Sequence, residues 1–185
     1  MNTQTKIRLR KMIELVGEGK ILEIGIEKNR MTNGTSLDCV KEYNPDILCD
    51  LNKEKIPSGD ESFDVVVAGE ILEHTINPYK VVKEFYRILK PKGTLILSVP
   101  NTCSLINRLN MLRGKLPTGC AMPSDDDSYA HHIVDFNKRN ITELLEKLGF
   151  KIEVITSNGI ITKGKLILKN IPASWGETLI VRGKK

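Results

Sequence analysis

The apolar run FDVVVA at residues 63–68 constrains the fold more than any other segment. Its β-branched residues follow one another without the polar alternation of a half-exposed strand, which is typical of a strand buried on both faces. Such strands occur in parallel sheets that helices cover on two sides. The run therefore predicts an α/β domain built around a central parallel strand.

Other strands and helices alternate along the chain. Further strands are predicted at 21–25, 35–38, 46–50, 94–99, 151–156 and 178–182. Helices are predicted within 1–19, from Asn77 to a stop at Pro91–Gly93, over 105–112, and from Asn137 to Gly149. This order predicts a Rossmann-like, mainly parallel sheet of the seven-stranded type with flanking helices. With 185 residues, one domain spanning 1–185 is expected.

Charge and composition narrow the function classes. The net charge of +5 allows an anionic partner, but basic and acidic residues are interspersed, as in Lys80, Lys83 and Glu84, which favours an ordinary solvated surface. The sequence has neither a membrane-spanning apolar run nor a signal-peptide pattern, so a cytoplasmic protein without a membrane span is expected. The cysteines lack metal-ligand spacing, and no metal site is predicted; they are Cys39, Cys49, Cys103 and Cys120.

Acids and glycines follow the predicted strands at the edge where α/β sheets bind ligands. They are Glu23, Gly25, Asp38, Asp50, Gly69 and Glu70. Asp38 can accept hydrogen bonds from a ribose diol, and Asp50 can accept from an adenine amino group while Leu51 packs on the purine. Each aspartate also suits a turn or a helix cap, but the ordered set favours a nucleoside site.

A family resemblance rests on these segments. The order ILEIG, TSLD, DILCDL, SFDVVVAGEILEH and RILKPKGTLILSVPN resembles class I S-adenosylmethionine-dependent methyltransferases, specifically the ubiquinone/menaquinone-type or methyltransferase domain 11 group. The resemblance implies S-adenosylmethionine as the cofactor and methyl transfer as the reaction.

The resemblance also assigns roles to individual residues. Glu23 and Gly25 match motif I, Asp38 the ribose-binding acid, Asp50 and Leu51 the adenine-binding pair, and Ala68, Gly69 and Glu70 the segment at the methionine end. Glu73 and His74 match the family's E-H pair, which is either catalytic or a buried pair that orients the loop after the fourth strand.

The chain departs from the family at motif I. Gly25 is followed by Ile26–Arg30 instead of a second glycine, and about nine residues separate the first two strands. Because a parallel crossover normally needs a dozen residues or more, the first crossover helix is predicted to be missing or trimmed. A positive charge from Lys28 or Arg30 can replace the lost helix dipole at the cofactor, although both also suit a solvated loop.

Methyl transfer from a sulfonium requires little chemistry from side chains, because alignment of the reactants supplies most of the rate enhancement. A general base is optional; its candidates are His74, Asn101, His131 and His132. Residues 100–135 are predicted to form a substrate lid, in which Arg108, Arg113 and Lys115 suit an anionic group. The acidic run at 125–127 is interpreted as a solvated loop.

Three functions remain to be compared. The first is S-adenosylmethionine-dependent methyl transfer to a small-molecule, lipid or glycan acceptor. The second is a noncatalytic relative with an eroded cofactor site, and the third, less favoured because no nucleic-acid motif is found, is a nucleic-acid methyltransferase. A nicotinamide-dependent oxidoreductase is excluded, because no G-x-G-x-x-G follows the first strand. The acceptor atom and the oligomeric state stay open.

Overall fold

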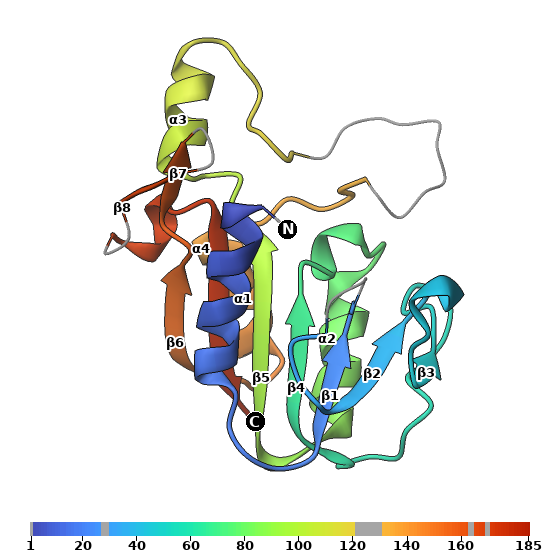
Figure 1. Ribbon diagram of the computed structural model, residues 1–185. Helices are drawn as coiled ribbons and strands as arrows, with labels where there is room; N and C mark the ends of the chain where they lie inside the picture. The colour runs from blue at the N-terminus through green and yellow to red at the C-terminus, as the bar shows by residue number, and fades with distance from the viewer. Residues whose placement is uncertain (1, 27–29, 121–130, 163–164, 169–170) are drawn as a thin grey trace.

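The computed structural model describes residues 2–26, 30–120, 131–162, 165–168 and 171–185. Their main feature is a seven-stranded sheet of order β3-β2-β1-β4-β5-β9-β6 (Figure 1). Its strands are β1 Ile21–Ile24, β2 Thr35–Asp38, β3 Ile47–Leu48, β4 Phe63–Gly69, β5 Leu89–Pro100, β6 Lys151–Ser157 and β9 Thr178–Lys184. The first five strands pair in parallel, and β9 is antiparallel to both β5 and β6. The predicted Rossmann-like α/β class is confirmed.

The described residues form four α-helices and three short 3-10 helices. They are α1 Thr3–Leu15, α2 Pro78–Ile88, α3 Leu105–Leu112 and α4 Lys138–Lys147, with short 3-10 helices η1 Lys41–Tyr43, η2 Leu72–His74 and η3 Ala173–Trp175. A separate hairpin joins β7 Ile160–Thr162 to β8 Lys165–Leu168. Figure 1 shows α1 in front of β5 and β9, and α2 and α4 behind the sheet. None of the described helices combines the length and the apolarity that crossing a membrane requires.

The two faces of β4 explain its continuous apolar run. Val65 and Val67 pack with Met12 of α1, whereas Val66 and Ala68 belong to the larger core that α2 and α4 cover. All four β4 side chains are at most 2% exposed. Asp64, the one polar residue of the run, accepts hydrogen bonds from the backbone N–H of Lys20 and the ammonium of Lys90 near the amino end of β4.

Helix boundaries follow local capping. Asn77 accepts a hydrogen bond from Lys80 N (3.1 Å), and Pro78 occupies the first turn of α2 as predicted. The predicted stop at Pro91–Gly93 is wrong, because α2 ends at Ile88 and β5 already begins at Leu89. The strand tolerates this proline because the pairing of β4 with β5 skips from Phe63↔Leu89 to Val65↔Thr94, which leaves the proline outside the regular ladder.

Apolar residues recur at helical spacing at Leu9, Met12, Ile13 and Val16, but α1 buries less of this stripe than the spacing predicts. Met12 is fully buried, but Ile13 is 47% exposed, and the helix ends at Leu15 before Gly17 and Gly19. Because α1 meets the sheet mainly along β5 and β9, only a narrow side of the helix is covered.

The connection from β1 to β2 is short, as the spacing predicts. Its described residues, 25–26 and 30–34, contain no helix. The buried carboxylate of Glu23 accepts hydrogen bonds from Met31 N (2.6 Å), Thr32 N (2.7 Å) and Thr32 Oγ1 (2.9 Å). A side chain of β1 therefore holds the returning loop against the sheet.

Candidate functional site

A cavity of about 580 Å³ lies at the carboxyl ends of β1, β2 and β4. This is the edge where open parallel sheets bind ligands. Six of the residues predicted for the cofactor line the cavity: Gly25, Asp38, Asp50, Leu51, Gly69 and Glu70. The topology therefore brings together residues that are far apart in the sequence.

The two aspartates lie on one side of the cavity. Asp38 ends β2, is 6% exposed, and accepts a hydrogen bond from Val40 N through Oδ1 (2.9 Å). Asp50 follows β3 and accepts from Asn52 N (3.0 Å) while its other oxygen meets Lys53 Nζ (2.9 Å). Each carboxylate thus stabilises a turn and also contributes to the cavity wall.

Two glycines permit the close approach of backbone to the cavity. Gly25 has φ +73°, and a Cβ placed there would overlap Cδ1 of Ile71. A Cβ on Gly69 would lie 3.2 Å from Arg8 Nη1. A side chain at either position would displace neighbouring groups, so glycine is required sterically at Gly25 and favoured at Gly69.

Arg8 is a site residue that the sequence reasoning missed. It comes from α1, lines the cavity, donates a hydrogen bond from Nη1 to Ser98 Oγ (3.2 Å), and lies 3.9 Å from Glu70 Oε1. The sequence shows it only as a basic residue off the apolar stripe of a helix. Its position follows from the docking of α1 on the sheet, for which the local sequence carries no signal.

Several expected residues lie elsewhere. Glu23 and Ala68 are buried and are not among the residues that line the cavity. Arg30 binds Gly34 O and forms an ion pair with Asp46 (3.1 Å), again outside the cavity lining. Lys28 lies outside the described residues. Arg8, rather than Arg30, is the described arginine at the end of the cavity near Gly69.

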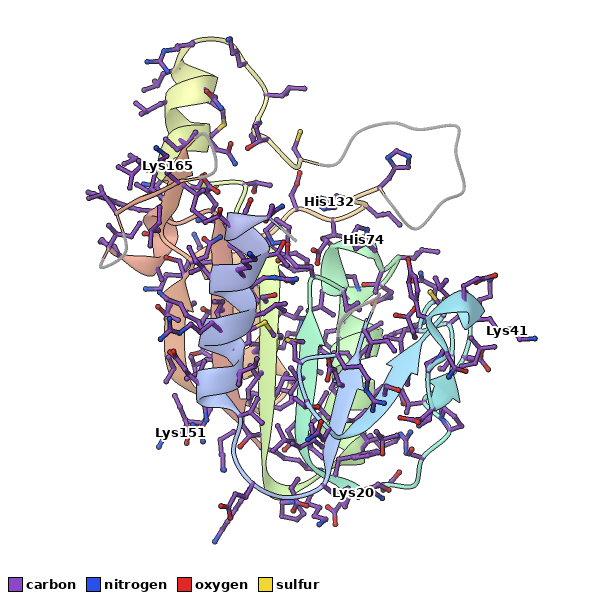
Figure 2. All side chains as sticks on the ribbon, in the orientation of Figure 1. Lys20, Lys41, His74, His132, Lys151 and Lys165 are labelled. Atoms are coloured by element: carbon purple, nitrogen blue, oxygen red, sulfur yellow. The ribbon has the colours of Figure 1, made fainter. Side chains whose placement is uncertain are left out.

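The candidate bases separate into two groups. His74 and His132 line the cavity, and their rings meet edge to face with centroids 5.0 Å apart. Figure 2 shows both histidines on neighbouring segments above the carboxyl ends of the strands. His131 and Asn101 do not belong to the lining. The buried Asn101 amide donates to Ser174 O (3.1 Å) and Gly176 O (2.7 Å), so it braces the turn after β5 against η3.

Glu73 lies beside these histidines in an unusual environment. It is 1% exposed, and neither carboxylate oxygen has a hydrogen-bond partner among the described residues. Burial, and then the negative charge of Glu70, raise its pKa well above the ordinary value. His74 Nε2 lies 4.0 Å from Glu73 Oε1.

The cysteine thiols at the cavity are poor nucleophiles. Burial raises the pKa of Cys39, and it raises the pKa of Cys49 to about 11. Both thiols are therefore protonated at neutral pH, and the thiolate that nucleophilic chemistry needs is scarce.

Comparison with known proteins gives a consistent result. The family model of the methyltransferase domain matches residues 28–97. A protein of Mycolicibacterium smegmatis described as a probable S-adenosylmethionine-dependent methyltransferase is 31% identical over 102 residues, which are 55% of this chain and 34% of that protein. The demethylmenaquinone methyltransferase of Lactobacillus johnsonii is 31% identical over 109 residues, 55% of this chain and 45% of the relative. The chain thus spans less than half the length of these two relatives.

The fold also has counterparts among solved structures. A Thermotoga maritima S-adenosylmethionine-dependent methyltransferase, a possible histamine N-methyltransferase, superposes with a TM-score of 0.68 at 19% identity. The superposition covers 97% of this chain and 90% of the other. At this identity the likeness concerns the fold alone.

Proposed function

We propose that this chain, a member of the class I S-adenosylmethionine-dependent methyltransferases, binds S-adenosylmethionine in the cavity and transfers its methyl group to a small-molecule, lipid or glycan acceptor. The observation that carries the proposal is the convergence of Gly25, Asp38, Asp50 and Gly69 on one cavity at the carboxyl edge of the sheet. A cavity of about 580 Å³ falls in the range of small-molecule sites.

The adenosine half would lie along the ends of β2 and β3. Asp38 accepts hydrogen bonds from the ribose diol, and Asp50 and Leu51 meet the adenine. The methionine half would extend past Gly25 and Gly69, where the backbone allows close approach. At that end the Arg8 guanidinium supplies positive charge for the methionine carboxylate. This charge takes the place of the N-terminus of a crossover helix, whose dipole would otherwise stabilise the carboxylate.

The sulfonium supplies an activated methyl group, so the residues of this chain mainly orient and enclose the reactants. His74 and His132 line the same cavity and are placed to accept a proton from an acceptor that must lose one. The buried Asn101 acts only through the turn that it braces.

The acceptor class is inferred from the described part of residues 100–135. Large apolar side chains are exposed on and after α3, namely Leu109, Met111, Leu112 and Leu116. They suit an acceptor with apolar surface, beside the basic residues Arg113 and Lys115. Arg108 is held by the carbonyls of Cys103 (2.7 Å) and Ser174 (3.3 Å). The acidic run at 125–127 lies outside the described residues.

One observation favours the noncatalytic alternative. The described part of the β1–β2 connection contains no helix, so no helix dipole from these residues faces the methionine end. A noncatalytic relative would bind the cofactor weakly or not at all, and it would release no S-adenosylhomocysteine in the presence of an acceptor.

Calorimetry with S-adenosylhomocysteine tests the proposal. We expect a dissociation constant in the micromolar to submillimolar range, and Asp38→Ala should weaken binding about 10- to 150-fold, because charge-assisted hydrogen bonds contribute roughly 1.5 to 3 kcal/mol. Asp60→Ala is the matched control, since Asp60 is 76% exposed and lies outside the cavity lining. Equal affinities in the two variants would reject the role of Asp38. No binding at millimolar ligand would reject the function itself.

A further inference from the structure

We propose that Glu73, His74 and His132 form a binding site for one divalent transition-metal ion, with zinc as the first ion to test, at the edge of the cavity. Each of the three residues lines the cavity. The proposal concerns a ligand set that the sequence did not predict, because no metal-ligand spacing connects residues 73–74 to residue 132. It does not depend on the cofactor that the cavity binds.

The first argument is proximity. One carboxylate oxygen and one nitrogen of each imidazole lie within 4.8 Å of one another. Zinc takes imidazole and carboxylate ligands at about 2.0–2.2 Å, which puts two ligands of a tetrahedral ion roughly 3.4 Å apart. The three groups therefore need to approach by about an ångström, which small rotations of half-buried histidines provide.

The second argument is the tautomer of the two histidines. His74 Nδ1 lies 3.0 Å from the carbonyl oxygen of His131, and His132 Nδ1 contacts the carbonyl oxygen of Gly119. A carbonyl only accepts, so each Nδ1 donates the hydrogen, and in a neutral imidazole this leaves the lone pair on Nε2. Metal-binding histidines typically show this arrangement, in which the second nitrogen donates to a carbonyl and fixes the ring.

The third argument is the state of the Glu73 carboxyl group. A buried carboxylate without hydrogen bonds is costly, and a neutral carboxylic acid would still need an acceptor for its proton. Among the described residues neither Glu73 oxygen has a hydrogen-bond partner. A bound cation would satisfy both oxygens of this buried group.

The backbone holds the ligand set together. Ile133 N donates to Glu73 O (2.7 Å), and Val134 N donates to the same carbonyl (3.2 Å). These bonds fasten the segment that carries His132 onto η2, which carries Glu73 and His74. Main-chain hydrogen bonds thus hold together the two segments that carry the three ligands.

Titration with zinc tests the site. Chain stripped with EDTA should bind one Zn²⁺ in calorimetry, and Co²⁺ should give visible absorption of a nitrogen- and oxygen-ligated ion. His74→Gln and His132→Gln should each weaken Zn²⁺ binding at least tenfold. His131→Gln is the matched control, because its ring is outside the cluster although it neighbours His132, and its affinity should stay within about twofold of wild type.

Folding is verified for each variant by circular dichroism. His132→Gln keeps the test valid if His74→Gln unfolds, because His132 is only partly buried. Zinc affinity that is equal in wild type, His74→Gln and His132→Gln, or that falls as much in His131→Gln, would overturn the proposal. S-adenosylhomocysteine binding to the metal-free chain is measured in parallel, so a failed metal site and a failed cofactor site give different results.

Discussion

Gly25 shows how far a single residue determines the shape of the cavity. Its left-handed φ of +73° is unfavourable for other residues, and the space where a Cβ would stand is already filled by Ile71. Gly17, only a few residues earlier, has open space around it, with no neighbouring atom within 4 Å of where its Cβ would stand. At Gly25 a side chain would clash with a neighbouring residue, whereas at Gly17 it would not. Comparing the two positions therefore distinguishes a steric requirement for glycine from a general effect on backbone flexibility.

We predict that Gly25→Ala destabilises the chain by about 2 to 5 kcal/mol, the sum of the left-handed strain and the overpacking against Ile71. Urea unfolding measures the loss. Gly17→Ala serves as the control and should leave the unfolding free energy nearly unchanged. Similar losses of unfolding free energy in both variants would show that overlap with Ile71 does not contribute to the destabilisation.

At the scale of elements, the β1–β2 connection depends on one buried carboxylate. The Glu23 side chain accepts three hydrogen bonds from Met31 and Thr32. These contacts hold the short loop in place of the packing that a crossover helix normally provides. Glu23, the residue that matches the motif I acid, therefore stabilises the loop and is not among the residues that line the cavity.

We predict that Glu23→Gln lowers the unfolding free energy by about 2 to 4 kcal/mol, because an amide nitrogen would face backbone N–H donors and the charge-assisted bonds would be lost. Chemical denaturation is the measurement. Glu14→Gln makes the same chemical change at an exposed pair with Arg10 and should have little effect. If Glu23→Gln is as mild as the control, the loop is held by other contacts.

Much of the fold could be predicted from sequence patterns. The strands at 21–24, 35–38 and 63–69 and the caps Asn77 and Asn137 follow local rules of burial and hydrogen bonding. The predicted strand at 46–50 shortens to Ile47–Leu48, because β3 lies at the sheet edge and Leu48 is 55% exposed. The hairpin of β7 and β8 was not predicted, and its exposed β8 has no alternation of buried residues to reveal it.

The cavity lining could be predicted only where its residues lie at strand ends. Asp38 and Gly69 end strands and Asp50 follows one, and the order of these strands fixes the edge on which the three residues meet. Arg8 and His132 reach the cavity from α1 and from the segment after residue 130, so their positions depend on tertiary docking. No periodicity in the sequence carries that information.

At the scale of the whole molecule, the cavity joins parts of the chain from Thr5 to His132. A ligand that fills it contacts α1, the ends of several strands and η2 at once. Binding should therefore stabilise the entire folded domain rather than one loop.

We predict that S-adenosylhomocysteine at 100 times its dissociation constant adds about 2.7 kcal/mol of stability, which raises Tm by roughly 5 to 10 °C for a domain of this size. Differential scanning fluorimetry gives the shift. Asp38→Ala at the same ligand concentration should show a clearly smaller one. A full shift in that variant, or none in wild type, would contradict the assignment of the cavity.

The place of β9 between β5 and β6 also sets the order in which the chain can fold as it leaves the ribosome. Among the described strands, β6 pairs only with β9, yet β9 is synthesised after it. Until residues 178–184 emerge from the exit tunnel, β6 has no partner strand and the far edge of β5 stays open. A nascent chain can thus assemble β1 to β5 early, but the complete sheet waits for its last strand.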